Sequence, residues 1–256
     1  MERCKYNIYV KGDEPEKLEP MDILISDRRE LEVLRLCLGD RANFVIRNPK
    51  KNTTFRISAE ADRSKLDWDY RNPEEAYSVI ERIKMPPEIE QRLSERTQMM
   101  QKEYVHKVHQ ENVLISDAER MENMVYFRGF NYIEELRSDH NADHLDGIKL
   151  FEAARQATLA AFHVMGVTCQ GVMALTASYV DYKKYVELDE PYYIQIIPAC
   201  KPDGGAMYSV FSIIQEDSVN ASGYFGAYTF RNRELYLNKR KVALENRCKR
   251  GIGGIN

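Results

Sequence analysis

The sequence has few cysteines and no long apolar segment. Its five cysteines are scattered along 256 residues without a C-x-x-C pair, which fits reduced thiols better than a disulfide scaffold. The longest apolar runs are far shorter than a bilayer span, and Met1–Lys11 is too polar for the apolar part of a secretory signal. No internal repeat or low-complexity segment is visible. We therefore expect a cytoplasmic globular protein that does not enter a membrane.

The net charge of −3 is unevenly distributed. The segment from Arg231 to Arg250 holds eight basic and two acidic residues, a net charge of +6, while the rest of the chain carries −9. Such a segment is either a solvated helix face or an attractive surface for nucleic acid, anionic lipid or an acidic protein. Nucleic-acid binding has no further support, because the helix expected at Asp27–Gly39 lacks a second helix at helix-turn-helix spacing.

The chain divides into four expected parts: a small N-terminal α/β domain at 1–60, a linker with helices at 61–102, a third domain at 103–232, and a basic tail at 233–256. In the first part, Asp27 and Glu30 form a capping-box pattern and Gly39 suits the C-terminal cap of the helix. Turn-forming residues within Asn43–Ser58 predict a hairpin there. Helical segments are expected at Pro73–Lys84 and Glu88–Glu103.

The third part has the pattern of a sheet around one buried helix. The expected strands are Tyr104–Ser116 and Met124–Phe130, followed by a helix at Leu145–Met165 and by β-rich blocks at Val172–Val186, Tyr192–Cys200 and Met207–Thr229. The last block is long enough for two strands joined near Asp217–Ser222. The helix has almost no polar face, so it should be buried on most sides. This order predicts an α+β protein with a hotdog fold, an antiparallel sheet wrapped around a central helix.

A few polar residues interrupt this apolar helix. Glu152, Gln156 and His163 follow one stripe, and Arg155 lies beside Glu152. A buried charge is costly unless it is paired or used in chemistry. One interpretation is a structural Glu152–Arg155 ion pair with Gln156 capping a backbone group, and the other is a functional site.

Two histidines precede the helix, His140 and His144, at a spacing that would suit a metal on a helix. The surrounding Asp and Asn residues are more typical of a polar loop, and no third ligand is evident. We therefore expect no metal and no cofactor.

Three motifs in order carry a resemblance to a known family. They are Val105-His106-Lys107 with the run Asn112–Asp117; Arg137, His140 and Asp146 with the run Leu150–Ala157; and Ala161-Phe162-His163 with Gly166-Val167. Residues 103–232 thereby resemble the A-factor biosynthesis hotdog family. Gly147 and Thr168 stand where that family has proline. The chain also carries one hotdog copy where the γ-butyrolactone enzymes of the family have two in tandem, so the site would have to form across a homodimer or be lost.

The resemblance implies transfer of a β-ketoacyl group from an acyl carrier protein, or from acyl-CoA, to the hydroxyl of a dihydroxyacetone phosphate-like acceptor in γ-butyrolactone-type biosynthesis. Desolvation would raise the pKa of Glu152 and make it a general base, with His140 as a second acid or base. Arg155 would pair with Glu152 or bind a substrate phosphate. The expected substrate-binding residues are Gly147 and Ile148, whose N–H groups would hold the thioester carbonyl, together with Gln156, His163 and His106.

Two other interpretations stay open. The domain is another hotdog thioester enzyme, a dehydratase or thioesterase, or it is a non-catalytic acyl-binding regulator. The acyl chain, the acceptor and the role of the N-terminal domain are not specified by the sequence.

Overall fold

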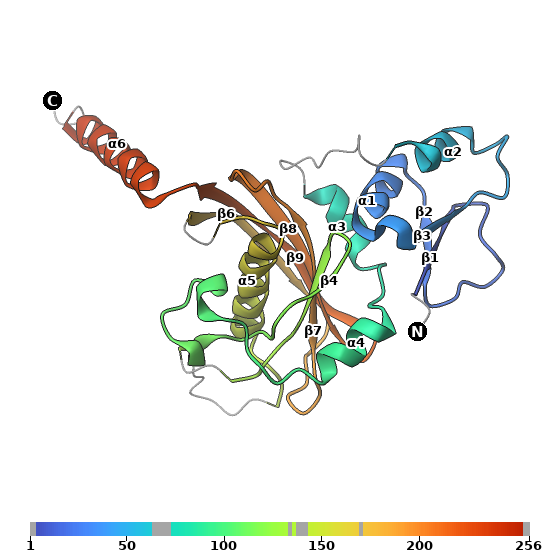
Figure 1. Ribbon diagram of the computed structural model, residues 1–256, viewed down its shortest axis with the longest axis horizontal. Helices are drawn as coiled ribbons and strands as arrows, with labels where there is room; N and C mark the ends of the chain where they lie inside the picture. The colour runs from blue at the N-terminus through green and yellow to red at the C-terminus, as the bar shows by residue number, and fades with distance from the viewer. Residues whose placement is uncertain (1–3, 63–72, 133–134, 137–142, 169–170, 253–256) are drawn as a thin grey trace.

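The computed structural model describes residues 4–62, 73–132, 135–136, 143–168 and 171–252, and it contains two sheets (Figure 1). The strands are β1 (Tyr6–Val10), β2 (Asp22–Ile25), β3 (Ala42–Val45), β4 (Glu119–Met121), β5 (Met124–Arg128), β6 (Val172–Tyr182), β7 (Tyr193–Ala199), β8 (Gly205–Gln215) and β9 (Ser218–Phe230). The helices are α1 (Arg28–Leu38), α2 (Thr53–Glu60), α3 (Glu74–Ile80), α4 (Pro87–Ser94), α5 (Gly147–Val164) and α6 (Arg233–Ile252), with short 3-10 helices η1 (Gly39–Arg41), η3 (Lys102–Val105) and η4 (Gln110–Asn112).

The N-terminal unit is a parallel three-stranded sheet of order β2-β1-β3 with α1 and α2 beside it. The predicted capping box of α1 is confirmed, because the Asp27 side chain accepts a hydrogen bond from the backbone of Arg29 and Glu30 accepts one from the backbone of Asp27. The predicted hairpin at 43–58 is wrong. β3 pairs in parallel with β1, and the next segment is α2. The buried Arg35 donates hydrogen bonds to the carbonyls of Ser58 in α2 and of Ala61 just after it.

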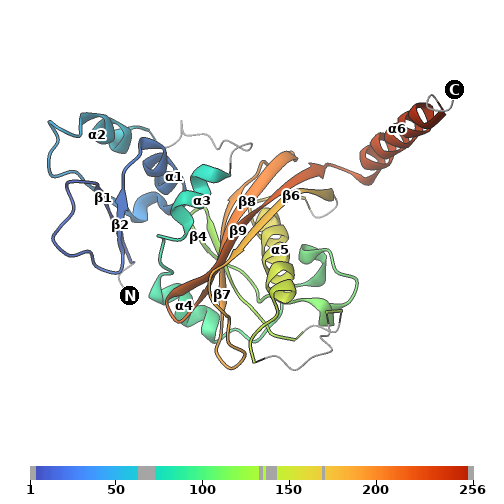
Figure 2. The same cartoon turned by 180° about the vertical axis from the view of Figure 1, so that it is seen from behind.

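The larger sheet is antiparallel, with strand order β4-β5-β7-β8-β9-β6, and α5 lies across one face of it (Figures 1 and 2). The predicted buried helix and the three β-rich blocks are confirmed, and together they form the hotdog arrangement. β8 and β9 join through Glu216 and Asp217, which both have positive φ (49° and 59°), as a two-residue type I′ turn requires. The turn therefore comes just before the predicted position near Asp217–Ser222.

Two predicted elements are shorter or different. The expected strand at 104–116 is instead η3, η4 and a run that forms only isolated bridges, such as Ile115 with Gly129. The expected helix at 88–103 ends at Ser94. The segment between α4 and β4 thus lies along α5 as an irregular chain, and α5 contacts η3.

The two faces of the large sheet belong to different cores. Along β8, Tyr208 and Val210 pack with Ile8 and Leu34 of the N-terminal unit, whereas Phe211 packs on the α5 side. α3 also contacts β8, and Gln195 of β7 donates hydrogen bonds to the carbonyls of Ile80 and Ile83. The N-terminal unit and α3 therefore cover one face, and α5 covers the other.

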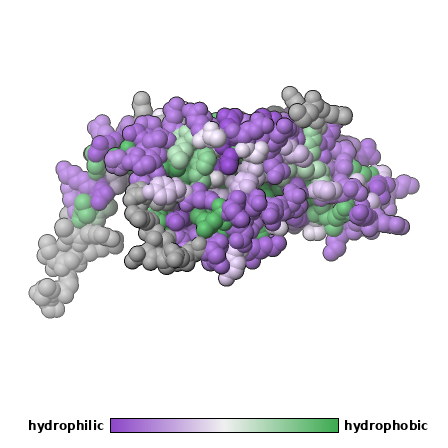
Figure 3. Space-filling view, turned by 90° about the horizontal axis from the view of Figure 1, so that it is seen from below, coloured by the Kyte–Doolittle hydropathy of each residue, from purple (hydrophilic) through white to green (hydrophobic). Residues whose placement is uncertain are grey.

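The C-terminal α6 extends away from both sheets (Figures 1 and 2). Its large apolar side chains are about half exposed, including Leu235 (47%) and Leu244 (53%). On the face of the molecule seen in Figure 3, hydrophilic side chains dominate, with separate apolar patches between them. Within the described ranges, no helix is both long and apolar enough to cross a bilayer.

Candidate functional site

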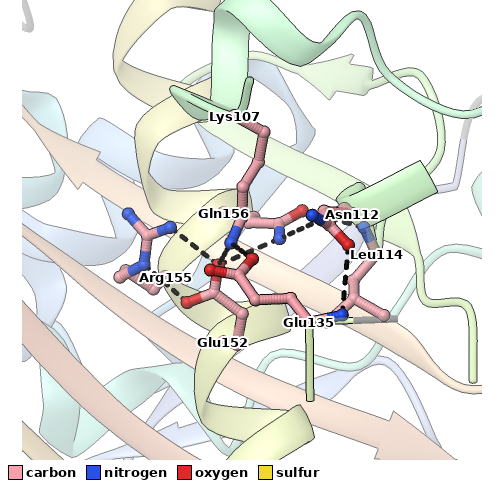
Figure 4. Close-up of polar contacts among 7 residues, drawn as sticks. All are labelled: Lys107, Asn112, Leu114, Glu135, Glu152, Arg155 and Gln156. Atoms are coloured by element: carbon pink, nitrogen blue, oxygen red, sulfur yellow. Dashed lines mark hydrogen bonds and ion pairs between the residues drawn. The ribbon is translucent and has the colours of Figure 1, made fainter. Parts of the chain in front are cut away.

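The centre of the polar stripe on α5 is Glu152, whose carboxylate is held by a bidentate ion pair (Figure 4). Arg155 donates from Nε to Oε2 and from Nη2 to Oε1, each at 2.7 Å. The two residues are neighbours on the helix surface, three positions apart. The predicted Glu152–Arg155 pair is confirmed, and its fork geometry fixes the guanidinium in one orientation.

A second cation reaches Glu152 from outside the helix. Lys107 Nζ lies 2.9 Å from Glu152 Oε1 and also pairs with Glu135. Lys107 and Glu152 are both shielded, with side chains 11% and 13% exposed, whereas Glu135 is 49% exposed. Lys107 belongs to the first family-like motif, but no local pattern pairs it with Glu152, because the contact spans 45 positions along the chain.

Gln156 links the helix to the irregular segment before β4. Its Oε1 accepts a hydrogen bond from the backbone N–H of Leu114 at 2.8 Å, and its Nε2 donates to the carbonyl of Asn112 at 2.9 Å and to Glu152 at 3.0 Å. The side chain is fully buried. The prediction that Gln156 caps backbone groups is confirmed, and a buried amide with all these bonds satisfied rigidifies its surroundings.

This environment sets the charge of Glu152. Burial on its own raises the pKa of the carboxyl group, but the hydrogen bonds and charge of Arg155, together with bonds from Gln156 and Lys107, lower the pKa to about 2. The predicted rise in this pKa is therefore wrong. Glu152 is a stable anion and a weak base at neutral pH, and its two cations are the physical reason.

A cavity of about 130 Å³ lies between α5 and strands β6 and β9, next to this network. Its lining is mainly apolar and consists of His106, Arg155, Thr158, Leu159, Phe162, Met173, Leu175, Phe225 and Ala227. Apolar cavities of roughly 150 Å³ hold a benzene molecule, so this one has room for about six carbon atoms. Arg155 and His106 are the basic residues of the lining.

His106 also contacts the end of α5. It has a left-handed backbone (φ 56°), and its Nε2 lies 3.1 Å from Nε2 of the buried His163. Burial, and then the neighbouring His163 and Arg155, lower the pKa of His106 to about 4. Burial likewise lowers the pKa of His163. Both imidazoles are therefore neutral near pH 7.

The other predicted residues lie elsewhere. Gly147 begins α5 and its carbonyl accepts a hydrogen bond from the Tyr182 hydroxyl at 2.6 Å, while the Ile148 side chain is 58% exposed. The eight residues from Gly147 to Arg155 correspond to about 12 Å along a helix, so the helix start does not line the cavity. His140 lies outside the described residues. Among the residues that are described, no three His, Cys, Asp or Glu side chains gather as possible metal ligands.

The cavity and the Glu152 network lie within a region of the chain that matches a known protein family. Residues 89–230, more than half of the chain, match the A-factor biosynthesis hotdog domain. The chain belongs to this family. The A-factor hotdog domain thus includes most of α4, the irregular segment that carries Lys107, α5 and all six strands of the large sheet. No curated protein matches the chain.

Several solved structures are similar to parts of the chain. A hypothetical thioesterase from Streptococcus pneumoniae with coenzyme A is 17% identical, with 46% of this chain and 87% of that one covered at a TM-score of 0.37. An uncharacterized protein from Pyrococcus horikoshii is 15% identical, with 54% and 98% covered at 0.39. The E. coli PaaI protein from the phenylacetic acid degradation operon is 13% identical, with 44% and 81% covered at 0.35.

Proposed function

We propose that this A-factor hotdog domain binds an acyl thioester with its acyl group in the cavity between α5, β6 and β9. The observation that carries the proposal is the combination of an apolar lining with one oriented guanidinium. Leu159, Phe162 and Phe225 offer the surface that an acyl chain needs, and Arg155 is held in place by Glu152. A preorganised guanidinium at such a site suits a phosphate or a polarised carbonyl oxygen.

The reaction that we propose is transfer of a β-ketoacyl group from acyl carrier protein or acyl-CoA to the hydroxyl of a dihydroxyacetone phosphate-like acceptor. Membership of the A-factor family supports this reaction, and the position of Arg155 at the cavity supports an acceptor that carries a phosphate. Glu152 then acts through Arg155: its low pKa keeps it charged, so it holds the guanidinium rather than removing a proton.

A second candidate is acyl binding without catalysis. Among the described residues that line the cavity there is no carboxylate, and the nearby Glu152 is neutralised by Arg155 and Lys107. An acyl-binding regulator needs only the apolar surface and an anchor for the polar end of its ligand.

We further propose that the protein is a homodimer. β6 is one of the two edge strands of the large sheet, and Leu175 (53%) and Tyr179 (45%) on it are exposed. An exposed edge strand of 11 residues is a template for pairing with another chain. Because Met173 and Leu175 of β6 line the cavity, a second copy on this edge would close its outer side.

Binding and reaction can be tested together. The protein is mixed with β-ketoacyl-CoA thioesters of increasing chain length, with and without dihydroxyacetone phosphate, and released thiol and acyl product are measured. Acyl transfer requires the acceptor for thiol release, and a thioesterase does not. A dehydratase is tested with the corresponding β-hydroxyacyl-CoA, from which it would eliminate water to give the enoyl-CoA without releasing thiol. A non-catalytic binder retains the thioester unchanged, as native mass spectrometry would show.

A cavity-filling variant locates the acyl group. Ala227→Leu should remove binding of the longer chains, because Ala227 lines the cavity. Ala206→Leu on β8 is the matched control, since Ala206 is exposed and is not part of the lining, and its binding should equal that of the wild type. Equal binding by the wild type and Ala227→Leu would refute the proposed acyl site.

A further inference from the structure

The pair of histidines beside the cavity has a defined pattern of donors and acceptors. His163, at the end of α5, is 7% exposed, and its Nδ1 lies 2.8 Å from the carbonyl oxygen of Val167. Its other ring nitrogen, Nε2, lies 3.1 Å from Nε2 of His106. The rings of Tyr104 and His163 pack in a T-shaped arrangement, with ring centroids 5.8 Å apart.

These contacts determine where the protons are. A carbonyl oxygen can only accept, so Nδ1 of His163 carries a proton and donates it to Val167. A neutral imidazole has one N–H, so Nε2 of His163 is an acceptor, and Nε2 of His106 must be the donor between the rings. Nδ1 of His106 is then left with a lone pair.

His106 is held in a strained backbone conformation. A left-handed conformation is unfavourable in a residue other than glycine, and His106 adopts it where η3 ends. The turn is closed by a 2.9 Å hydrogen bond from the backbone of Lys107 to the carbonyl of Lys102. Consecutive side chains of this turn both reach α5, His106 to His163 and Lys107 to Glu152.

We propose that His163 is a positioning residue that holds His106 with its proton on Nε2, so that Nδ1 of His106 accepts the proton of the acceptor hydroxyl in the cavity. This inference rests on the proposed acyl transfer. The hydroxyl oxygen bonds to the thioester carbonyl carbon as its proton moves to Nδ1 of His106. The carbon–sulfur bond then breaks, and the leaving thiolate takes that proton, giving an ester and a free thiol.

Long-range proton–nitrogen NMR spectra of the histidine rings in the full chain test the proton pattern directly. In the wild type, Nδ1 of His106 should give the signal of an unprotonated ring nitrogen and Nε2 that of an N–H, with the opposite pattern in His163. A protonated Nδ1 on His106, or two N–H groups on His163, would overturn the proposal whether or not any thioester reacts.

Two substitutions of His163 separate positioning from packing. His163→Asn keeps a donor for the Val167 carbonyl but removes the acceptor for His106, so both tautomers of His106 should appear and kcat should fall by roughly tenfold or more at similar KM. His163→Gln places an amide oxygen near the lost Nε2 and should restore much of the rate. Unchanged kcat in His163→Asn would overturn the proposal.

Substitution of His106 itself tests the proton transfer. His106→Asn offers an acceptor without a basic nitrogen, and kcat should fall by about two to four orders of magnitude. His109→Asn is the control, because His109 lies in the same segment with a 64% exposed side chain and should leave kcat unchanged. If the wild type reacts but His106→Asn retains full activity, the proposed base is wrong. If the wild type shows no reaction at all, the proposed function fails and the NMR spectra still decide the proton pattern.

Discussion

Replacing Glu152 with glutamine should destabilise the fold, because the carboxylate holds two cations in a shielded position. Glu152 accepts hydrogen bonds from Arg155 and Gln156 and pairs with Lys107 at 2.9 Å. The amide of Glu152→Gln keeps the shape but removes the charge, which leaves both cations underpaired and turns a donor group toward one of them. Breaking one partner of a buried ion pair typically costs about 3–5 kcal/mol.

The pKa of Glu152 gives an independent value for the loss of folding free energy. A fall from the ordinary value of 4.5 to about 2 corresponds to roughly 3 kcal/mol of stabilisation of the charged form in the folded chain. For a chain of this size, that change lowers Tm by roughly 6–12 °C. Because folding lowers this pKa, the stabilisation is complete above pH 4.5 and is lost as the pH falls toward about 2. The difference between wild type and variant should therefore be constant near neutral pH and shrink in acid.

Thermal melts and denaturant titrations of Glu152→Gln measure this change, with Glu135→Gln as the matched control. Glu135 pairs with the same Lys107 but is 49% exposed, so its loss should change stability by less than about 1 kcal/mol. An acyl-transfer assay on the same samples separates a structural role from a chemical one. A Glu152→Gln protein that melts like the wild type but has lost its activity would refute the structural role and restore Glu152 as a catalytic base.

Three other outcomes are expected. Sedimentation at micromolar concentration should show a dimer, because β6 leaves a long sheet edge exposed, and a monomer alone would contradict this. Replacing Lys239, Arg240 and Lys241 on α6 with glutamine should weaken binding of an acyl carrier protein and flatten its salt dependence, whereas stronger competition by duplex DNA would assign the helix to another partner. Stability should decrease as the pH falls from 6.5 toward about 4, because the unfolded chain binds a proton at His106 first; this loss should be smaller in His106→Asn, as melts across this pH range can show.

Local patterns in the sequence were sufficient to predict the elements and contacts that depend on residues close together in the chain. The capping box of α1 involves Asp27 and Glu30, three positions apart, and the pair of Glu152 and Arg155 has the same spacing on α5. The apolar composition of α5 predicted its burial, and the β-rich blocks after it predicted the strands of the hotdog sheet. These features follow from helix periodicity and side-chain polarity, which need no knowledge of distant contacts.

Tertiary contacts decided the elements on which local patterns were wrong. The segment Thr53–Glu60 has strand-like composition, yet it is a helix whose terminal carbonyls accept hydrogen bonds from Arg35. The segment 104–116 is mostly irregular: the carbonyl of Asn112 and the N–H of Leu114 bond to Gln156, and backbone bonds to β5 and Phe130 form only at its end, from Leu114 to Ser116. In both cases buried polar side chains replace the partners that a sheet would have supplied.

The chemistry of the site was likewise decided by residues far apart in the chain. Burial alone predicted a raised pKa for Glu152, and the sign reverses because Lys107, 45 positions earlier, and Arg155 both face the carboxylate. His106 and His163 are 57 positions apart, so their pairing follows only from the fold. The sequence determined which polar groups enter the apolar helix, and the tertiary structure determined their partners, because desolvation and charge pairing act through space and oppose each other at the same atoms.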